Sequence, residues 1–167
     1  MHGGSVGAVV GVAFGCAWGI AGATALPNPL SVWGVRLSIG ISVALAAALT
    51  MLPARRKAGI FRGQVYGVAV AIEAAGIFLA VWSLRHLSLQ QFLLPAIGFV
   101  VGLHFIGLWK ATDMPLFRWV AGALCTICVV AAFSPGLTQN GGIDMRRVVA
   151  GLGSALVLWA AGLATLF

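Results

Sequence analysis

Six long runs of apolar residues, separated by short polar segments, make up most of the chain. They cover residues 6–26, 32–52, 64–84, 92–109, 116–133 and 146–166. Each is close to the roughly 20 residues that an α-helix needs to cross the hydrocarbon core of a bilayer. The runs are continuously apolar, whereas the strands of a membrane β-barrel alternate between apolar and polar residues. The pattern therefore predicts an all-α, polytopic integral membrane protein, a compact bundle of six transmembrane helices that forms one domain over residues 1–167 and contacts the lipid bilayer.

The composition excludes several classes of protein. Apolar residues make up 61% of the chain and charged residues 8%, whereas about 25% of a soluble domain is charged. The chain has 10 Lys and Arg against 3 Asp and Glu, a formal net charge of +7. So few charges cannot cover the surface of a water-soluble globule, which excludes a cytosolic enzyme, a disordered chain and a nucleic-acid-binding domain. Nucleic acid is therefore not an expected partner.

The basic residues predict the orientation in the membrane. The loop between the second and third runs, residues 53–62, contains four cations and no acid, which places it in the cytoplasm by the positive-inside rule. Both termini are then cytoplasmic, and the predicted location is the cell (inner) membrane. Lys110 and Arg118 raise the cytoplasmic total to six, against four on the other side: Arg36, Arg85, Arg146 and Arg147. Most of these cations are expected to anchor helix ends among the lipid headgroups.

The first apolar run raises the question of a cleaved signal. Ala23-Thr24-Ala25 has the small residues of a cleavage site, but no Lys or Arg precedes the run. A signal peptide needs a basic segment before its apolar region. We therefore expect a retained helix.

Small residues recur four positions apart in several runs. The glycines of this kind are Gly7, Gly11, Gly15, Gly19, Gly67, Gly98 and Gly102. Small residues allow the backbones of membrane helices to approach closely. The pattern indicates tight packing within the chain or, alternatively, a face for a homo-oligomer or a membrane partner subunit.

The first three runs align with the last three at an offset of 86 or 87 residues. At this offset Gly11 and Gly15 fall on Gly98 and Gly102, and Trp33 falls on Trp119. A repeated unit with three crossings has inverted topology, which is common in secondary transporters. Helices rich in Gly and Ala also align by chance, so two inverted three-helix repeats and a coincidence both stay open.

Glu73 is the only acidic residue deep inside a predicted span. It lies about ten positions into the third run, roughly 15 Å deep at 1.5 Å per residue. A charge at this depth is costly, so the carboxyl group should be paired, hydrated or protonated. Glu73 is therefore a candidate ligand or proton site, and the alternative is a neutral carboxyl group hydrogen-bonded within the bundle.

His104, in the fourth run, has a predicted depth similar to that of Glu73. The third and fourth runs are antiparallel neighbours in the chain, so their side chains can meet. A carboxylate beside an imidazole can relay protons, because imidazole exchanges protons near neutral pH. The alternative for His104 is a structural hydrogen bond between helices.

The remaining polar residues give weaker signals. Lys110, Arg118 and Arg36 either anchor helix ends or make secondary contacts with an anion. Cys125 and Cys128 form a C-x-x-C motif in the middle of a span, where cysteines usually act as small packing residues. A structural zinc site needs four ligands, and the histidines lie at different depths, so we expect no metal site and no cofactor.

These observations favour a transporter or channel-type protein. Glu73 and His104 would form a midplane site for proton- or cation-linked passage of a small solute or ion. The alternative is an accessory or structural subunit of a membrane complex, without transport of its own. A membrane enzyme acting on lipid is the weakest of the three, because the chain carries no nucleophile motif, Walker loop or paired carboxylates.

Overall fold

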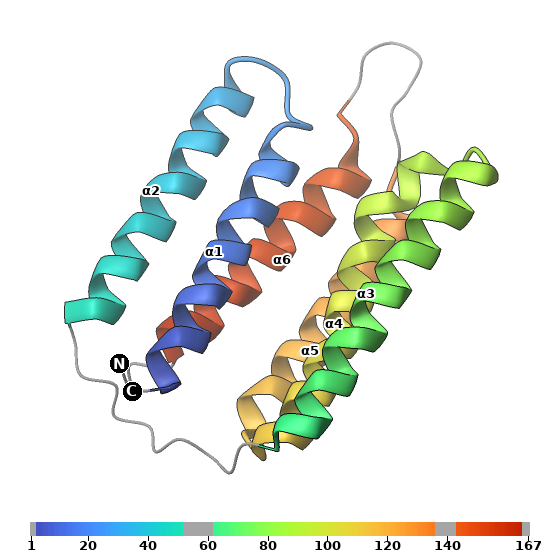
Figure 1. Cartoon of the computed structure of the whole chain (residues 1–167). Helices are drawn as coiled ribbons and strands as arrows, with labels where there is room; N and C mark the ends of the chain where they lie inside the picture. Colours follow the sequence, from blue (N-terminus) through green and yellow to red (C-terminus); the bar gives the residue numbers. More distant parts are fainter. Residues whose placement is uncertain (1–2, 52–61, 136–142, 165–167) are drawn as a thin grey trace.

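The computed structural model of the chain describes residues 3–51, 62–135 and 143–164, with side chains from residue 9 onward. These residues form six α-helices and one short 3₁₀ helix, and none of them forms a strand (Figure 1). The elements are α1 (Gly3–Ala23), α2 (Leu30–Met51), α3 (Gly63–His86), η1 (Gln90–Phe92), α4 (Leu93–Thr112), α5 (Pro115–Phe133) and α6 (Met145–Ala164). The prediction of an all-α membrane bundle is confirmed.

Five of the six helices, α2 to α6, are long and apolar enough to cross a membrane. In α1 the apolar helix whose side chains are described is the shorter segment Val9–Ala23, so its crossing stays a prediction. Local residues set two of the helix ends. Pro115 occupies the first turn of α5, where its missing N–H costs nothing, and Asp113 ends α4 in the left-handed conformation at φ 54°.

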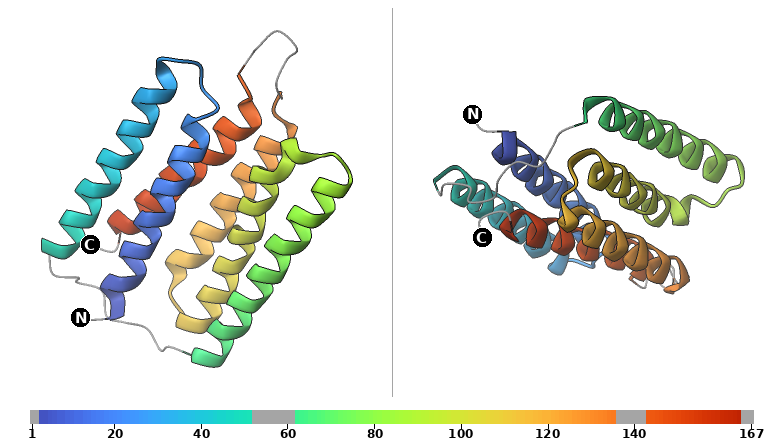
Figure 2. Two further views of the ribbon diagram at one scale, coloured as in Figure 1. Left: turned by 45° about the horizontal axis from the view of Figure 1, so that its top comes forward. Right: turned by 90° about the horizontal axis from the view of Figure 1, so that it is seen from below.

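Successive helices run in opposite directions, so that α1 begins and α6 ends at the same end of the bundle (Figure 1). The order in space differs from the order in sequence. α1 packs most extensively on α6, α6 also contacts α5, α5 packs on α4, and α4 packs on α3 (Figure 2). α2 lies beside α1 at one side of the bundle, and α3 lies at the other side.

The core joins the helices from both sides of the bundle. Trp18 of α1 packs with Leu124 of α5 and with Leu158 and Trp159 of α6. The Trp159 indole Nε1 donates a buried hydrogen bond of 3.0 Å to the Ser42 hydroxyl of α2. This bond ties α2 to α6 without a charged group.

The α1–α6 contact brings two backbones together. Gly22 and Gly151 face each other, and a Cβ on Gly151 would collide with the Gly22 backbone. Gly15 and Gly19 lie against the Trp159 indole, where a Cβ on Gly15 would lie 2.7 Å from the ring. The close approach of α1 and α6 therefore requires glycine.

The α4–α5 contact places cysteines over glycines. A Cβ on Gly98 would lie 2.5 Å from the Cys128 sulfur, and one on Gly102 would lie 2.8 Å from the Cys125 sulfur. Both thiols are free and fill the space that the glycines leave.

Two other glycines that recur four positions apart, Gly11 and Gly67, do not lie at such close contacts. A Cβ added to Gly11 or Gly67 would meet no atom of the described residues within 4 Å, and Gly7 lies outside the residues whose surroundings are described. The internal repeat stays a prediction. α1–α2 and α4–α5 are both antiparallel pairs, but no contact comparable to α5–α6 joins α2 and α3 within the described helices.

Candidate functional site

Glu73 and His104 meet between α3 and α4. The His104 Nδ1 atom lies 3.3 Å from the Glu73 Oε2 atom. Glu73 is ten residues from the start of α3, and His104 is eight residues from the end of the antiparallel α4. At 1.5 Å per residue, both lie roughly 12–15 Å from that end of the bundle. The pair therefore lies well inside the membrane-spanning helices.

Small residues on either side of the pair hold α3 close to α4. The Cβ of Ala69 would lie 2.5 Å from a Cβ on Gly107, and Val100 would lie 2.9 Å from a Cβ on Gly76. Ala69 is one turn before Glu73 on α3, and Gly76 is about one turn after it. The two backbones therefore approach closely at the depth where the ionisable groups meet.

The pair is shielded but not sealed. The His104 side chain is 10% exposed and the Glu73 side chain 21% exposed. Although Nδ1 is within ion-pair distance of the carboxylate, it is buried and makes no aligned hydrogen bond to any described residue. An unaligned contact is weaker than a directed hydrogen bond. The two ionisable groups are therefore in contact without a directed hydrogen bond between them.

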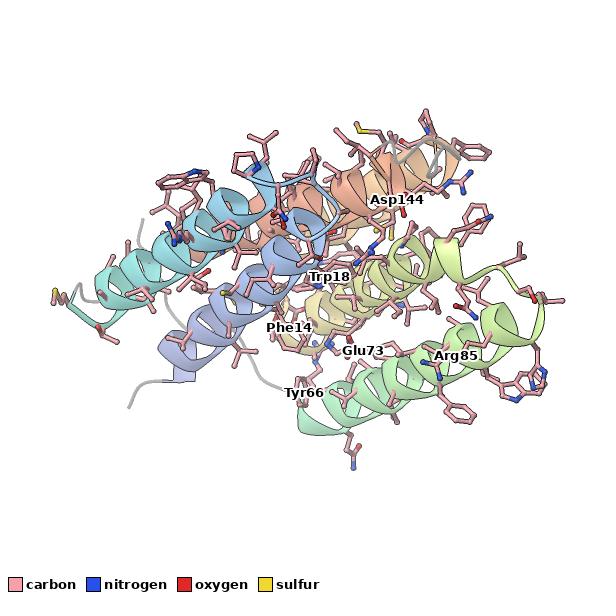
Figure 3. All side chains as sticks on the ribbon, turned by 90° about the horizontal axis from the view of Figure 1, so that it is seen from above. Phe14, Trp18, Tyr66, Glu73, Arg85 and Asp144 are labelled. Carbon is pink, nitrogen blue, oxygen red and sulfur yellow. The ribbon has the colours of Figure 1, made fainter. Side chains whose placement is uncertain are left out.

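Aromatic residues of α1 lie across from the pair. Figure 3 places Glu73 on the α4 side of α3, with Phe14 and Trp18 of α1 opposite. Trp18 is buried, whereas Phe14 is 52% exposed.

Arg62 has a role that its place in the sequence did not indicate. Its backbone N–H donates to the Ala111 carbonyl at 2.9 Å, and its guanidinium pairs with Asp113 at 3.1 Å and donates to the Lys110 carbonyl. Arg62 thereby fastens the start of α3 to the end of α4. The signal available in the sequence was Asp113, an acid in a short connection that a cation-rich loop could reach.

Two of the three basic residues proposed for secondary contacts, Arg118 and Arg36, lie on tryptophans. The Arg118 guanidinium lies 5.6 Å from the Trp109 ring and 5.7 Å from the Trp119 ring, and that of Arg36 lies 5.4 Å from Trp33. These are cation–π distances. Neither arginine forms an ion pair with any acid that the structure describes. A role in anion binding remains a proposal for them and for Lys110.

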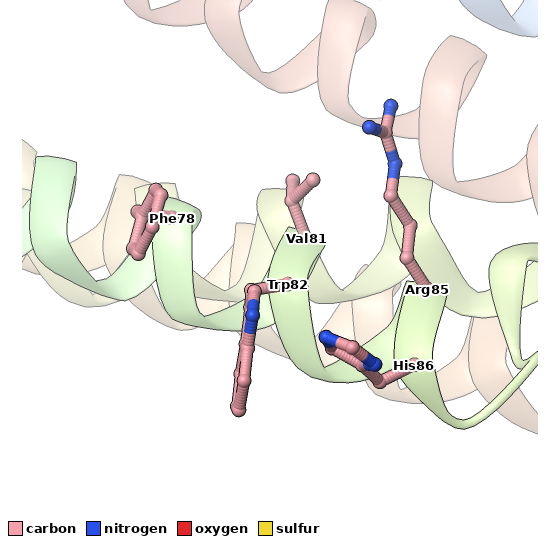
Figure 4. Close-up of a pocket in the computed structure, with 5 residues that line it drawn as sticks. All are labelled: Phe78, Val81, Trp82, Arg85 and His86. Carbon is pink, nitrogen blue, oxygen red and sulfur yellow. The ribbon is translucent and has the colours of Figure 1, made fainter.

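A shallow depression lies at the opposite end of α3 from Arg62. Phe78, Val81, Trp82, Arg85 and His86 line it, and all five come from this one helix (Figure 4). Trp82 and His86 stack edge to face at 4.7 Å, and Arg85 points to the other side of the helix. Because all of its lining residues belong to α3, the depression is one side of this helix and not a binding cleft between helices.

The described residues contain no group of three or more metal-ligating side chains. Comparison of the chain with protein-family models, with curated proteins and with solved structures finds no match. The function therefore has to be argued from the geometry of this chain.

Proposed function

We propose that this multi-pass membrane protein is a small transporter or channel-type protein in which Glu73 and His104 bind a proton or a cation. The contact between the two side chains carries the proposal. An ionisable group within a span is expensive and is usually functional. Here a carboxylate and an imidazole from two helices lie 3.3 Å apart. A purely structural contact could be made by uncharged residues, as Ser42 and Trp159 show.

The chemistry of the pair suits coupled binding. A proton on the imidazole gives a positive charge that the carboxylate neutralises. A proton on the carboxyl group can be donated to the neutral imidazole. A cation would bind the carboxylate oxygens only after His104 has released its proton, because an imidazolium would repel the ion. Passage of a small solute would then be linked to proton or cation binding at this depth.

The test is flux into liposomes that contain the purified protein. An internal pH dye reports proton movement when a potential is imposed. We expect Glu73→Gln to reduce flux to that of empty liposomes, and His104→Gln to reduce it in part. Asp113→Asn is the matched control, since it removes a carboxylate outside the spans and its amide oxygen can still accept a hydrogen bond from Arg62. Flux that is unchanged in Glu73→Gln would remove the pair from the mechanism.

One observation favours the alternative of an accessory subunit. α3 is described in full, and Ala69 is the only one of its residues that is buried. Its open apolar surface could receive a partner subunit or a second copy. Wild-type protein that produces no flux and co-purifies with a partner in mild detergent would support this alternative over transport.

A further inference from the structure

A shallow apolar groove of about 330 Å³ runs along α4, between α3 and α5. Ala80 of α3, Phe99 of α4 and Val129 of α5 are among its nine lining residues, which are all apolar or thiol side chains. The groove begins at Phe92, at the end of the bundle, and reaches Val100, roughly two helical turns deeper. Phe99 and Val129 are exposed, so the groove opens toward the bilayer.

Arg146 of α6 contacts Phe92, the lining residue at the outer end of this groove. The Arg146 guanidinium lies 4.5 Å from the centroid of the Phe92 ring. Its Nε donates a 2.9 Å hydrogen bond to the Ser134 carbonyl at the end of α5. These two contacts fix the guanidinium at the level of the helix ends, where the lipid headgroups lie.

Arg146 has donors to spare. Its two terminal nitrogens have no acceptor among the described residues, and no described carboxylate lies within 4.0 Å of it. A guanidinium offers five N–H donors in a planar fork that matches a phosphate group. The buried Asp144 is two residues away and does not pair with it. Among the described residues, nothing compensates the Arg146 charge.

We propose that this groove binds an anionic phospholipid, with the phosphate on Arg146 and one acyl chain along α4. Arg146, at the end of the bundle, would contact the charged headgroup. The apolar groove, which lies deeper, would contact the acyl chain. A partner helix would fill the apolar groove but would leave the cation without an anion. The proposal does not depend on transport by Glu73 and His104.

The test is native mass spectrometry of the protein, titrated with phosphatidylglycerol or phosphatidylcholine of identical acyl chains. We expect phosphatidylglycerol to bind about fivefold more tightly, the effect of one basic residue near an anionic headgroup. Arg146→Gln should abolish this preference, because it should weaken the binding of phosphatidylglycerol more than that of phosphatidylcholine, whose phosphate is already compensated by its choline group. Arg36→Gln is the matched control, because Arg36 also stacks on an aromatic ring, but that ring belongs to Trp33, which does not line the groove as Phe92 does.

Two further variants separate the site from a general charge effect. Val129→Trp fills the groove from its open edge and should weaken the binding of both lipids. Arg146→Lys keeps the charge, loses the planar fork and should retain part of the preference, which decides the matter if Arg146→Gln does not fold. Equal binding of the two lipids to the wild type, an equal loss in Arg36→Gln, or unchanged binding in Val129→Trp would each overturn the proposal.

Discussion

Replacing Glu73 and replacing His104 should have different costs, because the residue that remains in the membrane differs. Without His104, the carboxyl group must carry an uncompensated charge inside the membrane or hold a proton. Without Glu73, a neutral imidazole remains, which is less costly to keep at that depth. The His104→Ala change should therefore cost more stability than the Glu73→Ala change, and the lower exposure of the His104 side chain, 10% against 21%, acts in the same direction.

A double-mutant cycle measures the interaction directly. For Glu73→Ala and His104→Ala we expect a coupling free energy of about 0.5–1.5 kcal/mol, the range found for polar pairs between membrane helices. The measurement is the free energy of unfolding in detergent micelles for the wild type, both single variants and the double variant. A parallel cycle of Glu73→Ala with Ser42→Ala should be additive, since Ser42 lies on α2 and bonds to Trp159. Additivity in the first cycle would show that the pair contributes no interaction energy.

At the scale of the helices, the sequence predicted well that each helix forms, but it did not predict which helices pack against each other. Six long apolar runs were enough to predict six helices, because length and hydropathy determine a span. Spans that are apolar on every face carry no signal for which helix lies beside which. Gly15 and Gly11 belong to one ladder, yet Gly15 lies against Trp159, whereas a Cβ on Gly11 would meet none of the described atoms. Which glycines form contacts depends on the partner helix, here the distant α6.

The candidate site was accessible to the sequence in part. Counting residues from the ends of the two spans gave Glu73 and His104 similar depths in the membrane. This works because consecutive spans are antiparallel and are joined by a short connection. The contacts of Arg62 were not predicted, because they are made at the end of α4 and in the connection that follows it. The length and hydropathy of a span do not determine the conformation of such a connection. The α3–α4 hairpin is thus the part of the molecule that the sequence describes best.

The α1–α6 contact gives a stability prediction with a control on the same helix. Gly22→Ala places a Cβ 2.6 Å from the Leu152 backbone nitrogen and should cost about 1–3 kcal/mol, as overpacking usually does. Gly11→Ala meets no described atom within 4 Å and should leave stability unchanged or slightly raised. Thermal unfolding in detergent compares the two. Equal effects would mean that α1 and α6 do not meet through Gly22.

At the scale of the whole molecule, the six described helices alternate in direction, so α1 begins and α6 ends on the same side of the membrane. The structure places the start of α1 and the end of α6 together (Figure 1), and the basic loop 53–62 argues that this side is cytoplasmic. The cations at the opposite end, Arg146 among them, would then face the other leaflet.

Reporter fusions test this orientation. A fluorescent protein fused after Phe167 should fold in the cytoplasm and fluoresce, and alkaline phosphatase at the same place should be inactive. Replacing Arg55, Arg56 and Lys57 by Ala leaves three cations on that side against four on the other, so part of the population should invert. Replacing Arg146 and Arg147 instead should leave the wild-type result. Active phosphatase in the unmodified chain would reverse the proposed orientation.

The contact between α1 and α6 also has a consequence for biosynthesis. α1 leaves the ribosome before α6, its main partner, and more than 100 residues separate the two helices. At about 5–20 residues per second, α1 and α2 wait on the order of ten seconds for α6. During that interval the glycine surface of α1 and the Ser42 hydroxyl lack their final partners. A nascent chain that stalls before α6 would present these surfaces to insertion chaperones and to membrane proteases.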